Sequence, residues 1–203
     1  MNSKADAVQE FVLPGSRGGK RRARILAAFH ECIISKGYAK TTLRDVANAA
    51  DMSASHLLYY FPGKDTILEH YFQNVAQRIV GRIESFQTEP PEKQIELLAD
   101  LFFAGKGITS SEIGFMLECF GVAVNHTILH EEKAALDEHC KSHLAKLFAD
   151  TPRRFLPGAR DSAEVAYAML IGLRTAVFFD ARLELPEAHR LFHSSMLNIA
   201  GLE

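Results

Sequence analysis

Apolar residues recur along this chain every three or four positions, which is the period of an α-helix that buries one face. The first such stripe consists of Ile25, Leu26, Phe29, Cys32 and Ile33. Gly37 is its expected C-terminal stop, since glycine adopts the left-handed conformation that ends many helices. No segment alternates apolar and polar residues with the period of a strand. The pattern therefore predicts an all-α protein of about nine helices.

Start and stop signals divide the rest of the chain into further helices. Thr42 with Asp45, Thr109 with Glu112, and Pro186 at a first helical position are start signals, whereas Pro62-Gly63 and Pro90-Pro91 are stops. The helices expected after Gly37 span about 43–50, 53–61, 64–86, 92–106, 109–125, 129–150, 161–183 and 186–200.

The two short helices expected over 43–50 and 53–61 form a helix-turn-helix pattern. Ala47 and Ala50 are small enough to let the helices cross closely, and Met52 can fill the space beneath them. Ser53 can cap the second helix so that its first residues face outward. A second helix presented in this way can enter the major groove of DNA while the first lies across the backbone.

The charge distribution supports a polyanionic partner for this part of the chain. Residues 17–64 hold nine basic and three acidic residues, a net charge of +6, while the whole chain of 203 residues carries −2. The rest of the chain is therefore acidic. A basic unit attached to an acidic body favours contact with nucleic acid through the basic unit alone.

The segment from Arg24 to Leu68 resembles the DNA-binding domain of the TetR family of one-component repressors. The resemblance rests on Ile25-Leu26, Phe29, Lys36-Gly37-Tyr38, Thr42-Leu43-Arg44-Asp45-Val46-Ala47, Ser53, Leu57, Tyr59-Tyr60-Phe61 and Lys64-Asp65-Thr66-Ile67-Leu68. Three positions depart from the family pattern. Asp51 and Ser55 stand where the family has glycine, and Leu58 stands where it has tyrosine. Aspartate tolerates the left-handed geometry of the turn. Ser55 and Leu58 lie in the second short helix, so base preferences do not transfer from relatives.

The resemblance, together with the helix geometry, implies a set of DNA contacts. Residues of the second short helix should face the groove or its rim: Ser53, Ser55, His56 and Tyr59. Arg44 is expected to reach a guanine edge or a phosphate. Further phosphate contacts are expected from Thr42, Tyr60 and Lys64, with Arg21, Arg22 and Arg24 as additional basic contacts.

Three parts of the chain follow from this interpretation. Residues 1–16 are expected to be a flexible arm, 17–63 the DNA-binding domain, and 64–203 a helical domain for effector binding and dimerisation. One such DNA-binding domain buries too little surface for tight specific binding, so we expect a homodimer on a palindromic operator. The expected dimer residues are Val165, Met169, Gly172, Leu173, Ala176, Leu191 and Met196.

The effector is expected to be a small hydrophobic or amphipathic molecule held among the central helices. The candidate lining residues are Phe102, Phe103, Phe115, Met116, Cys119, Phe120, His126, Tyr167, Arg174 and Phe178. Aromatic residues at helical spacing more often belong to an ordinary core than to a ligand pocket, and this explanation stays open for those among them.

Two other regulatory hypotheses remain open. The pairs His126/His130 and His139/His143, the latter beside Cys140, have spacings that could hold a metal, so a metal- or redox-responsive regulator on the same scaffold is one alternative. A ligand-independent DNA-binding protein or activator is the other.

The remaining sequence features narrow the class of protein. The three cysteines, Cys32, Cys119 and Cys140, are too few and too scattered for a disulfide framework, and each is expected to be a small buried hydrophobe. The chain has no catalytic motif of the hydrolase, P-loop or zinc-protease type. Its N-terminus lacks a signal peptide pattern, and no apolar run reaches the roughly 20 residues of a membrane span. We therefore expect a cytoplasmic non-enzyme without metal, cofactor or membrane partner.

Overall fold

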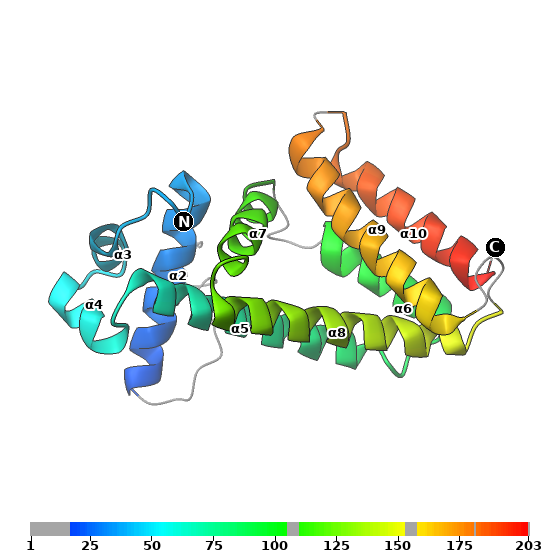
Figure 1. Cartoon of the computed structure of the whole chain (residues 1–203), viewed down its shortest axis with the longest axis horizontal. Helices are drawn as coiled ribbons and strands as arrows, with labels where there is room; N and C mark the ends of the chain where they lie inside the picture. The colour runs from blue at the N-terminus through cyan, green and yellow to red at the C-terminus, as the bar shows by residue number, and fades with distance from the viewer. Residues whose placement is uncertain (1–16, 105–109, 153–157, 181, 203) are drawn as a thin grey trace. The chain divides into compact units, whose positions relative to one another are not determined.

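Figure 1 shows the computed structural model, which describes residues 17–104, 110–152, 158–180 and 182–202. Over these ranges the chain forms helices without strands, so the all-α prediction is confirmed. The helices are α2 (Arg17–Lys36), α3 (Leu43–Ala49), α4 (Ala54–Tyr60), α5 (Lys64–Ser85), α6 (Pro91–Ala99), the π-helical turn η1 (Asp100–Ala104), α7 (Ser110–Ala123), α8 (Thr127–Ala149), α9 (Ala159–Phe179) and α10 (Leu185–Ala200). The arm expected over 1–16 and the cap expected at Thr109 lie outside the described residues.

The chain divides into two compact units, each with its own internal packing. Unit 1 comprises the residues up to Gln77 together with Glu118–Glu132, and unit 2 comprises Arg78–Leu117 and Lys133–Glu203. The division falls within α5, α7 and α8. The functional boundary expected between residues 63 and 64 stays a prediction.

The core of unit 1 is built from the apolar faces of α2, α3, α4 and the first half of α5. Its fully buried side chains include Ile25, Leu26, Phe29, Val46, Leu57, Phe61, Ile67 and Leu68. α2 packs against α3, and α3 packs against α4. Gly37 follows α2 with a positive φ of 81°, which is the left-handed stop expected there.

The core of unit 2 joins the end of α5 and the second half of α8 with α6, η1, α9 and α10. α10 packs against α6, η1 and α9. Among its fully buried side chains are Ile83, Ile95, Phe148, Phe192 and Met196. Pro186 lies in the first turn of α10, and Gly201 ends that helix with a left-handed conformation, so the start signal expected at Pro186 is confirmed.

The helix expected over 92–106 differs from the structure. α6 ends at Ala99, and Asp100–Ala104 winds as a π-helix. The wider turn changes the hydrogen bonding of the local carbonyls, and the Arg174 guanidinium of α9 donates to the Phe102 carbonyl at 2.7 Å. A contact between residues far apart in the sequence cannot be read from helical periodicity.

α9 is long and apolar enough to span a bilayer by length and composition alone. Its buried residues Ala163, Ala166, Leu170 and Val177 pack into the core of unit 2, which gives the apolar character another explanation. The helix also begins earlier than expected, at Ala159 rather than at Asp161, with Gly158 as its N-cap.

Candidate nucleic-acid interface

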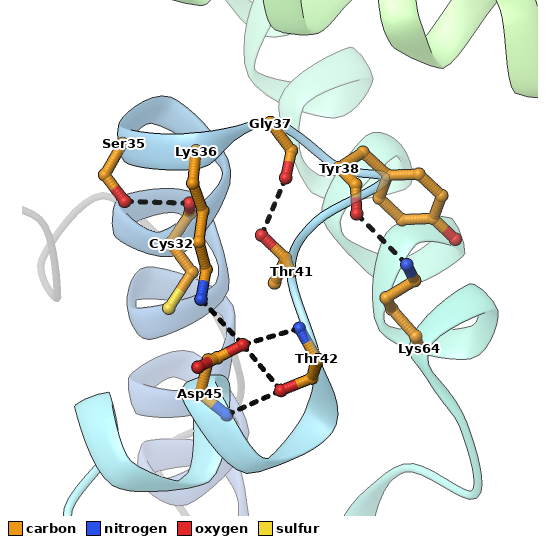
Figure 2. Close-up of polar contacts among 9 residues, drawn as sticks. All are labelled: Cys32, Ser35, Lys36, Gly37, Tyr38, Thr41, Thr42, Asp45 and Lys64. Carbon is orange, nitrogen blue, oxygen red and sulfur yellow. Dashed lines mark hydrogen bonds and ion pairs between the residues drawn. The ribbon is translucent and has the colours of Figure 1, made fainter.

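The first helix of the helix-turn-helix begins at a reciprocal capping box. Thr42 Oγ1 accepts a hydrogen bond from the Asp45 amide at 3.2 Å, and the Thr42 amide donates to the Asp45 carboxylate at 2.8 Å (Figure 2). Lys36 Nζ lies 2.6 Å from the same carboxylate. The hydrogen bonds from Lys36 and Thr42 hold the pKa of Asp45 well below its ordinary value. The carboxylate is therefore charged and fixes the start of α3 against the end of α2.

The turn between α3 and α4 uses an aspartate where the family pattern has glycine. Asp51 adopts a positive φ of 50°, a conformation that aspartate tolerates better than most residues. Its carboxylate lies 2.9 Å from the Arg24 guanidinium. Ala47 and Ala50 are buried beside this turn, as the close crossing of the helices requires. Arg24 thus pairs with the turn, and the backbone contact with DNA that we expected from it stays a prediction.

α4 begins at the expected cap and presents one face outward. Ser53 Oγ accepts from the His56 amide at 3.2 Å, so the N-cap prediction is confirmed. Leu57 is fully buried, which fixes the rotation of the helix about its axis. The outward face consists of the exposed residues Ala54, Ser55, Leu58 and Tyr59.

His56 and Tyr60 lie at the edge of this face rather than at its centre. The Arg21 guanidinium lies 3.1 Å from His56 Nε2, and the His56 and Tyr60 rings pack with centroids 5.4 Å apart. Both side chains are half-buried. This places His56 at the rim of the expected groove-facing surface, where Arg21 restrains its ring.

Two basic residues expected to contact DNA occupy different surroundings. Arg44 is exposed in the first turn of α3. Lys64 opens α5, where its ammonium donates to the Tyr38 carbonyl at 3.0 Å and lies 4.1 Å from the centroid of the Tyr38 ring (Figure 2). The Tyr38 hydroxyl in turn donates to Asp65. Burial is the main cause that raises the Tyr38 pKa well above its ordinary value, and the hydrogen bond to Asp65 adds to it. Lys64 is thus held at the start of α5. Its ammonium has three N–H donors, so it can still donate to a phosphate while bonded to the Tyr38 carbonyl.

Leu58, which departs from the family pattern, lies at the surface of α4. Its side chain is 45% exposed, although Leu57 beside it is fully buried. Adjacent residues of a helix point about 100° apart, so both leucines of a seven-residue helix cannot enter the same core. This consideration could have identified Leu58 as part of the outward face.

Polar contacts join the segment Glu118–Glu132 to the rest of unit 1. The Tyr38 amide donates to the Glu118 carboxylate, His126 Nε2 lies 3.2 Å from Glu69, and Gln73 donates to Glu132 at 2.8 Å. His126 Nδ1 also accepts from the Leu129 amide at 3.4 Å, at the start of α8. His126, a candidate polar anchor for the effector, therefore has a structural role as well.

The ten candidate effector residues are distributed over both units. Cys119, Phe120 and His126 belong to unit 1, and the other seven belong to unit 2. In unit 2, Arg174 bonds the Phe102 carbonyl, Phe103 packs on Phe192, and the Tyr167 hydroxyl donates to Asp137, which also accepts from Lys133. Phe178 covers Gly114 so closely that an added Cβ would lie 2.5 Å from its ring. These contacts place aromatic and charged groups together, and the assignment to an effector stays a prediction.

The candidate dimer residues form a partly exposed set on α9 and α10, which lie side by side (Figure 1). Val165 and Gly172 are exposed, while Met169, Leu173, Ala176 and Leu191 are half-buried. Met196 is fully buried in the core of unit 2. Beyond the expected set, Phe179 is 73% exposed at the end of α9.

The residues considered for metal or redox sensing do not form a cluster. In the part of the chain that the structure describes, no three His, Cys, Asp or Glu side chains converge as metal ligands. The three cysteines are buried, as expected, and burial raises the thiol pKa of each, in Cys140 to about 12. Thiols of this kind are poor nucleophiles and poor ligands at neutral pH. The observations therefore do not favour the metal- or redox-responsive alternative.

The capped helix-turn-helix and the basic residues around it define the class of this protein. Among the side chains of unit 1 that the structure describes, six lysines and arginines are exposed: Lys20, Arg21, Arg22, Arg24, Lys40 and Arg44. An outward-facing second helix in a basic unit is the arrangement with which helix-turn-helix proteins bind DNA.

Comparisons with known proteins relate this chain to one family of regulators. Residues 25–71 match the family model described as bacterial regulatory proteins, tetR family. The HTH-type transcriptional regulator BetI 1 of Chromohalobacter salexigens is 27% identical over 158 residues, which cover 75% of this chain and 76% of that protein. Residues 25–71 therefore match the DNA-binding domain of the TetR family, and the chain is similar to helix-turn-helix transcriptional regulators over three quarters of its length.

Solved structures share the fold over most of the chain. A transcriptional regulator from Rhodococcus sp. Rha1 has a TM-score of 0.77 at 16% identity, covering 88% of this chain and 95% of that one. A transcriptional regulator from Saccharomonospora viridis, solved in complex with choline, has a TM-score of 0.76 at 17% identity, covering 85% and 93%. The resemblance stated from the sequence is thereby confirmed, and the relatives are regulators rather than enzymes.

Proposed function

We propose that this protein is a cytoplasmic repressor that binds a palindromic operator as a homodimer and releases it when a small amphipathic molecule binds. The observation that carries the proposal is the outward face of α4, fixed in orientation by Leu57, in a unit whose described surface carries exposed arginines and lysines. A single α4 reaches only a few base pairs, so two copies related by a two-fold axis would supply specificity. Their half-sites would lie about 34–36 Å apart or a multiple of that distance.

The dimer is proposed to form through α9 and α10. Val165 and Phe179 are large apolar side chains that α9 leaves exposed, and the small Gly172 lies between them in the sequence. Small and large apolar residues on two antiparallel helices are the usual material of a four-helix interface. Leu191 of α10 would extend this surface, whereas the buried Met196 would support it from within the unit.

The effector is proposed to bind among the aromatic residues of unit 2. Apolar surface would come from Phe102, Phe115, Tyr167 and Phe178. Two of these residues contact charged side chains of opposite sign, since Arg174 donates to the Phe102 carbonyl and Asp137 accepts from the Tyr167 hydroxyl. Such a set suits an amphipathic molecule with one charged or polar end. The choline complex of the Saccharomonospora viridis regulator makes choline the first compound to test. To release DNA, the effector must favour the conformation with low DNA affinity.

The proposal is tested by selecting bound duplexes from sheared genomic DNA with the purified full-length protein at near-physiological salt. Enrichment of a palindrome, bound by two chains per site in sedimentation measurements, is the expected result. Choline or another amphipathic compound should then weaken binding and raise the melting temperature. Binding to all sequences alike would contradict the operator, and enrichment without any effector response would support a ligand-independent regulator. A reporter gene fused to the operator separates repression from activation.

The Lys64 ammonium provides a prediction about phosphate contact. Lys64→Ala should weaken binding to all duplexes alike and make the slope of log affinity against log salt shallower by about one for each chain in contact. Because Lys64 also bonds the Tyr38 carbonyl, thermal unfolding must be measured beside the salt titration. Lys93→Ala, which removes a surface lysine of unit 2 paired with Glu96, is the control. An unchanged slope in Lys64→Ala would show that this residue does not contact a phosphate.

A further inference from the structure

The exposed face of α4 lacks the side chains that most often read bases by hydrogen bonding. The helix sequence is Ala-Ser-His-Leu-Leu-Tyr-Tyr, without arginine, lysine, asparagine, glutamine or a carboxylate. Guanine is usually read by arginine or lysine, and adenine by asparagine or glutamine. His56, the one imidazole of the helix, is held at the rim by Arg21. The reading face therefore offers hydroxyl and methyl groups.

Leu58 and Ala54 form an apolar row on this face. They are four residues apart, so their side chains lie one above the other on the same side of the helix. Ser55 and Tyr59 form a parallel row of hydroxyl groups, again four residues apart. Leu58 is 45% exposed and Tyr59 is 82% exposed. Leu57 is fully buried, so the helix cannot rotate to bury Leu58 without exposing its core anchor.

DNA is the occupant that the surroundings of this row favour. Arg21, Arg22 and Arg44 are exposed in the same unit, and unit 1 carries the capped helix-turn-helix. These charges attract a polyanion, whereas a second protein surface would have to be acidic around an apolar centre. In the major groove, the only large apolar group on the base edges is the C5 methyl of thymine.

We propose that Leu58, supported by Ala54, determines operator specificity by packing against thymine methyl groups in the major groove. Each half-site then contains at least one thymine at the position that faces Leu58. The contact excludes water from the methyl group and discriminates against cytosine, which has no methyl group at C5. This inference deepens the proposed reading of an operator and rests on it.

The test removes one methyl group at a time from the DNA. Duplexes selected by the full-length protein from a random library are resynthesised with single deoxyuridines in place of thymines, which deletes only the C5 methyl. For the wild-type protein, deoxyuridine at one position of each half-site should weaken binding by about fourfold per half-site, since one buried methyl group is lost. In Leu58→Ala, the thymine and deoxyuridine duplexes should bind equally well.

Two further variants and a structural control complete the experiment. Leu58→Met keeps an apolar side chain and should retain the methyl sensitivity, whereas Leu58→Asn should shift the selected base at that position toward adenine. Because Leu58 is partly exposed, the unfolding free energy of Leu58→Ala should stay within about 1 kcal/mol of wild type.

Three outcomes would overturn the proposal. Insensitivity of the wild-type protein to deoxyuridine at every position would exclude methyl recognition. Equal sensitivity in wild type and Leu58→Ala would assign the methyl contact to another residue. A change of oligomeric state in Leu58→Ala without DNA would make this face a protein contact. Failure to enrich any sequence counts against the operator itself, so it is distinguishable from failure of the Leu58 contact.

Discussion

Replacing Phe29 with alanine should lower the free energy of unfolding by about 3–5 kcal/mol, the cost of deleting a buried aromatic ring and leaving a cavity. The Phe29 side chain is fully buried in α2 and packs edge-on against two tyrosines. Its ring centroid lies 6.3 Å from that of Tyr38 and 6.0 Å from that of Tyr71. Because Tyr38 also positions Lys64, we expect DNA binding to be lost together with stability.

The measurement is urea denaturation followed by far-ultraviolet circular dichroism, with DNA affinity measured in parallel. Tyr59→Ala is the matched control, since it also truncates an aromatic residue of unit 1 but one that is 82% exposed. Its unfolding free energy should change by less than about 0.5 kcal/mol, whereas its DNA affinity should fall. A loss below 1 kcal/mol in Phe29→Ala would mean that the ring is not a core element of the DNA-binding unit.

The second large effect concerns the pH dependence of stability and arises from His143 on α8. This side chain is only 4% exposed, and neither of its ring nitrogens has a hydrogen-bond partner in the described part of the chain. Burial, together with the electrostatic influence of His139 and Lys146, lowers its pKa from 6.5 to about 4. A buried imidazole without partners favours its neutral form.

The sign of the effect follows from the protons bound by each state. Between pH 6.5 and about 4, the unfolded chain takes up a proton at His143 that the folded chain does not. Stability is therefore lost as the pH falls, by up to about 1.4 kcal/mol for each pH unit and about 3 kcal/mol in total. At pH 7 and above, this contribution is fully recovered.

The prediction is checked by urea denaturation of wild type and His143→Leu at pH 7.5 and 4.5. The variant should be at least as stable as wild type at pH 7.5, because an apolar side chain replaces a buried polar one. It should also lose less stability on acidification, by about 2–3 kcal/mol. His130→Gln, at an exposed position of the same helix, should leave the pH dependence close to that of wild type. Equal acid sensitivity in all three proteins would assign the effect to other groups.

Much of the helix-turn-helix could be predicted because its determinants are local. A capping box requires only that Thr42 and Asp45 stand three residues apart, and Ser53 caps α4 through the amide three residues later. The left-handed turn at Asp51 and the stop at Gly37 depend on the intrinsic conformational preferences of those residues. Burial of Leu57 and Phe61 likewise follows from their spacing.

Where the sequence interpretation was wrong, contacts between distant residues decided the structure. The helix expected over 92–106 ends at Ala99, and Arg174 bonds a carbonyl of the π-helical turn that follows it. α9 starts at Ala159, two residues before the expected acidic start signal. In both cases the local pattern was compatible with several helix boundaries, and packing within unit 2 selected one.

The amino-acid sequence by itself determined the all-α class, the capped helix-turn-helix and the side of α4 that enters the core. Each of these depends on residue spacing over one or two helical turns, and hydrophobic burial acts on that spacing directly. Only the tertiary structure showed that Arg21 lies against His56 and that Glu118 accepts a hydrogen bond from the Tyr38 amide. These features depend on how separate helices meet, because a side chain's partner is set by the distance between elements rather than by its place in the pattern.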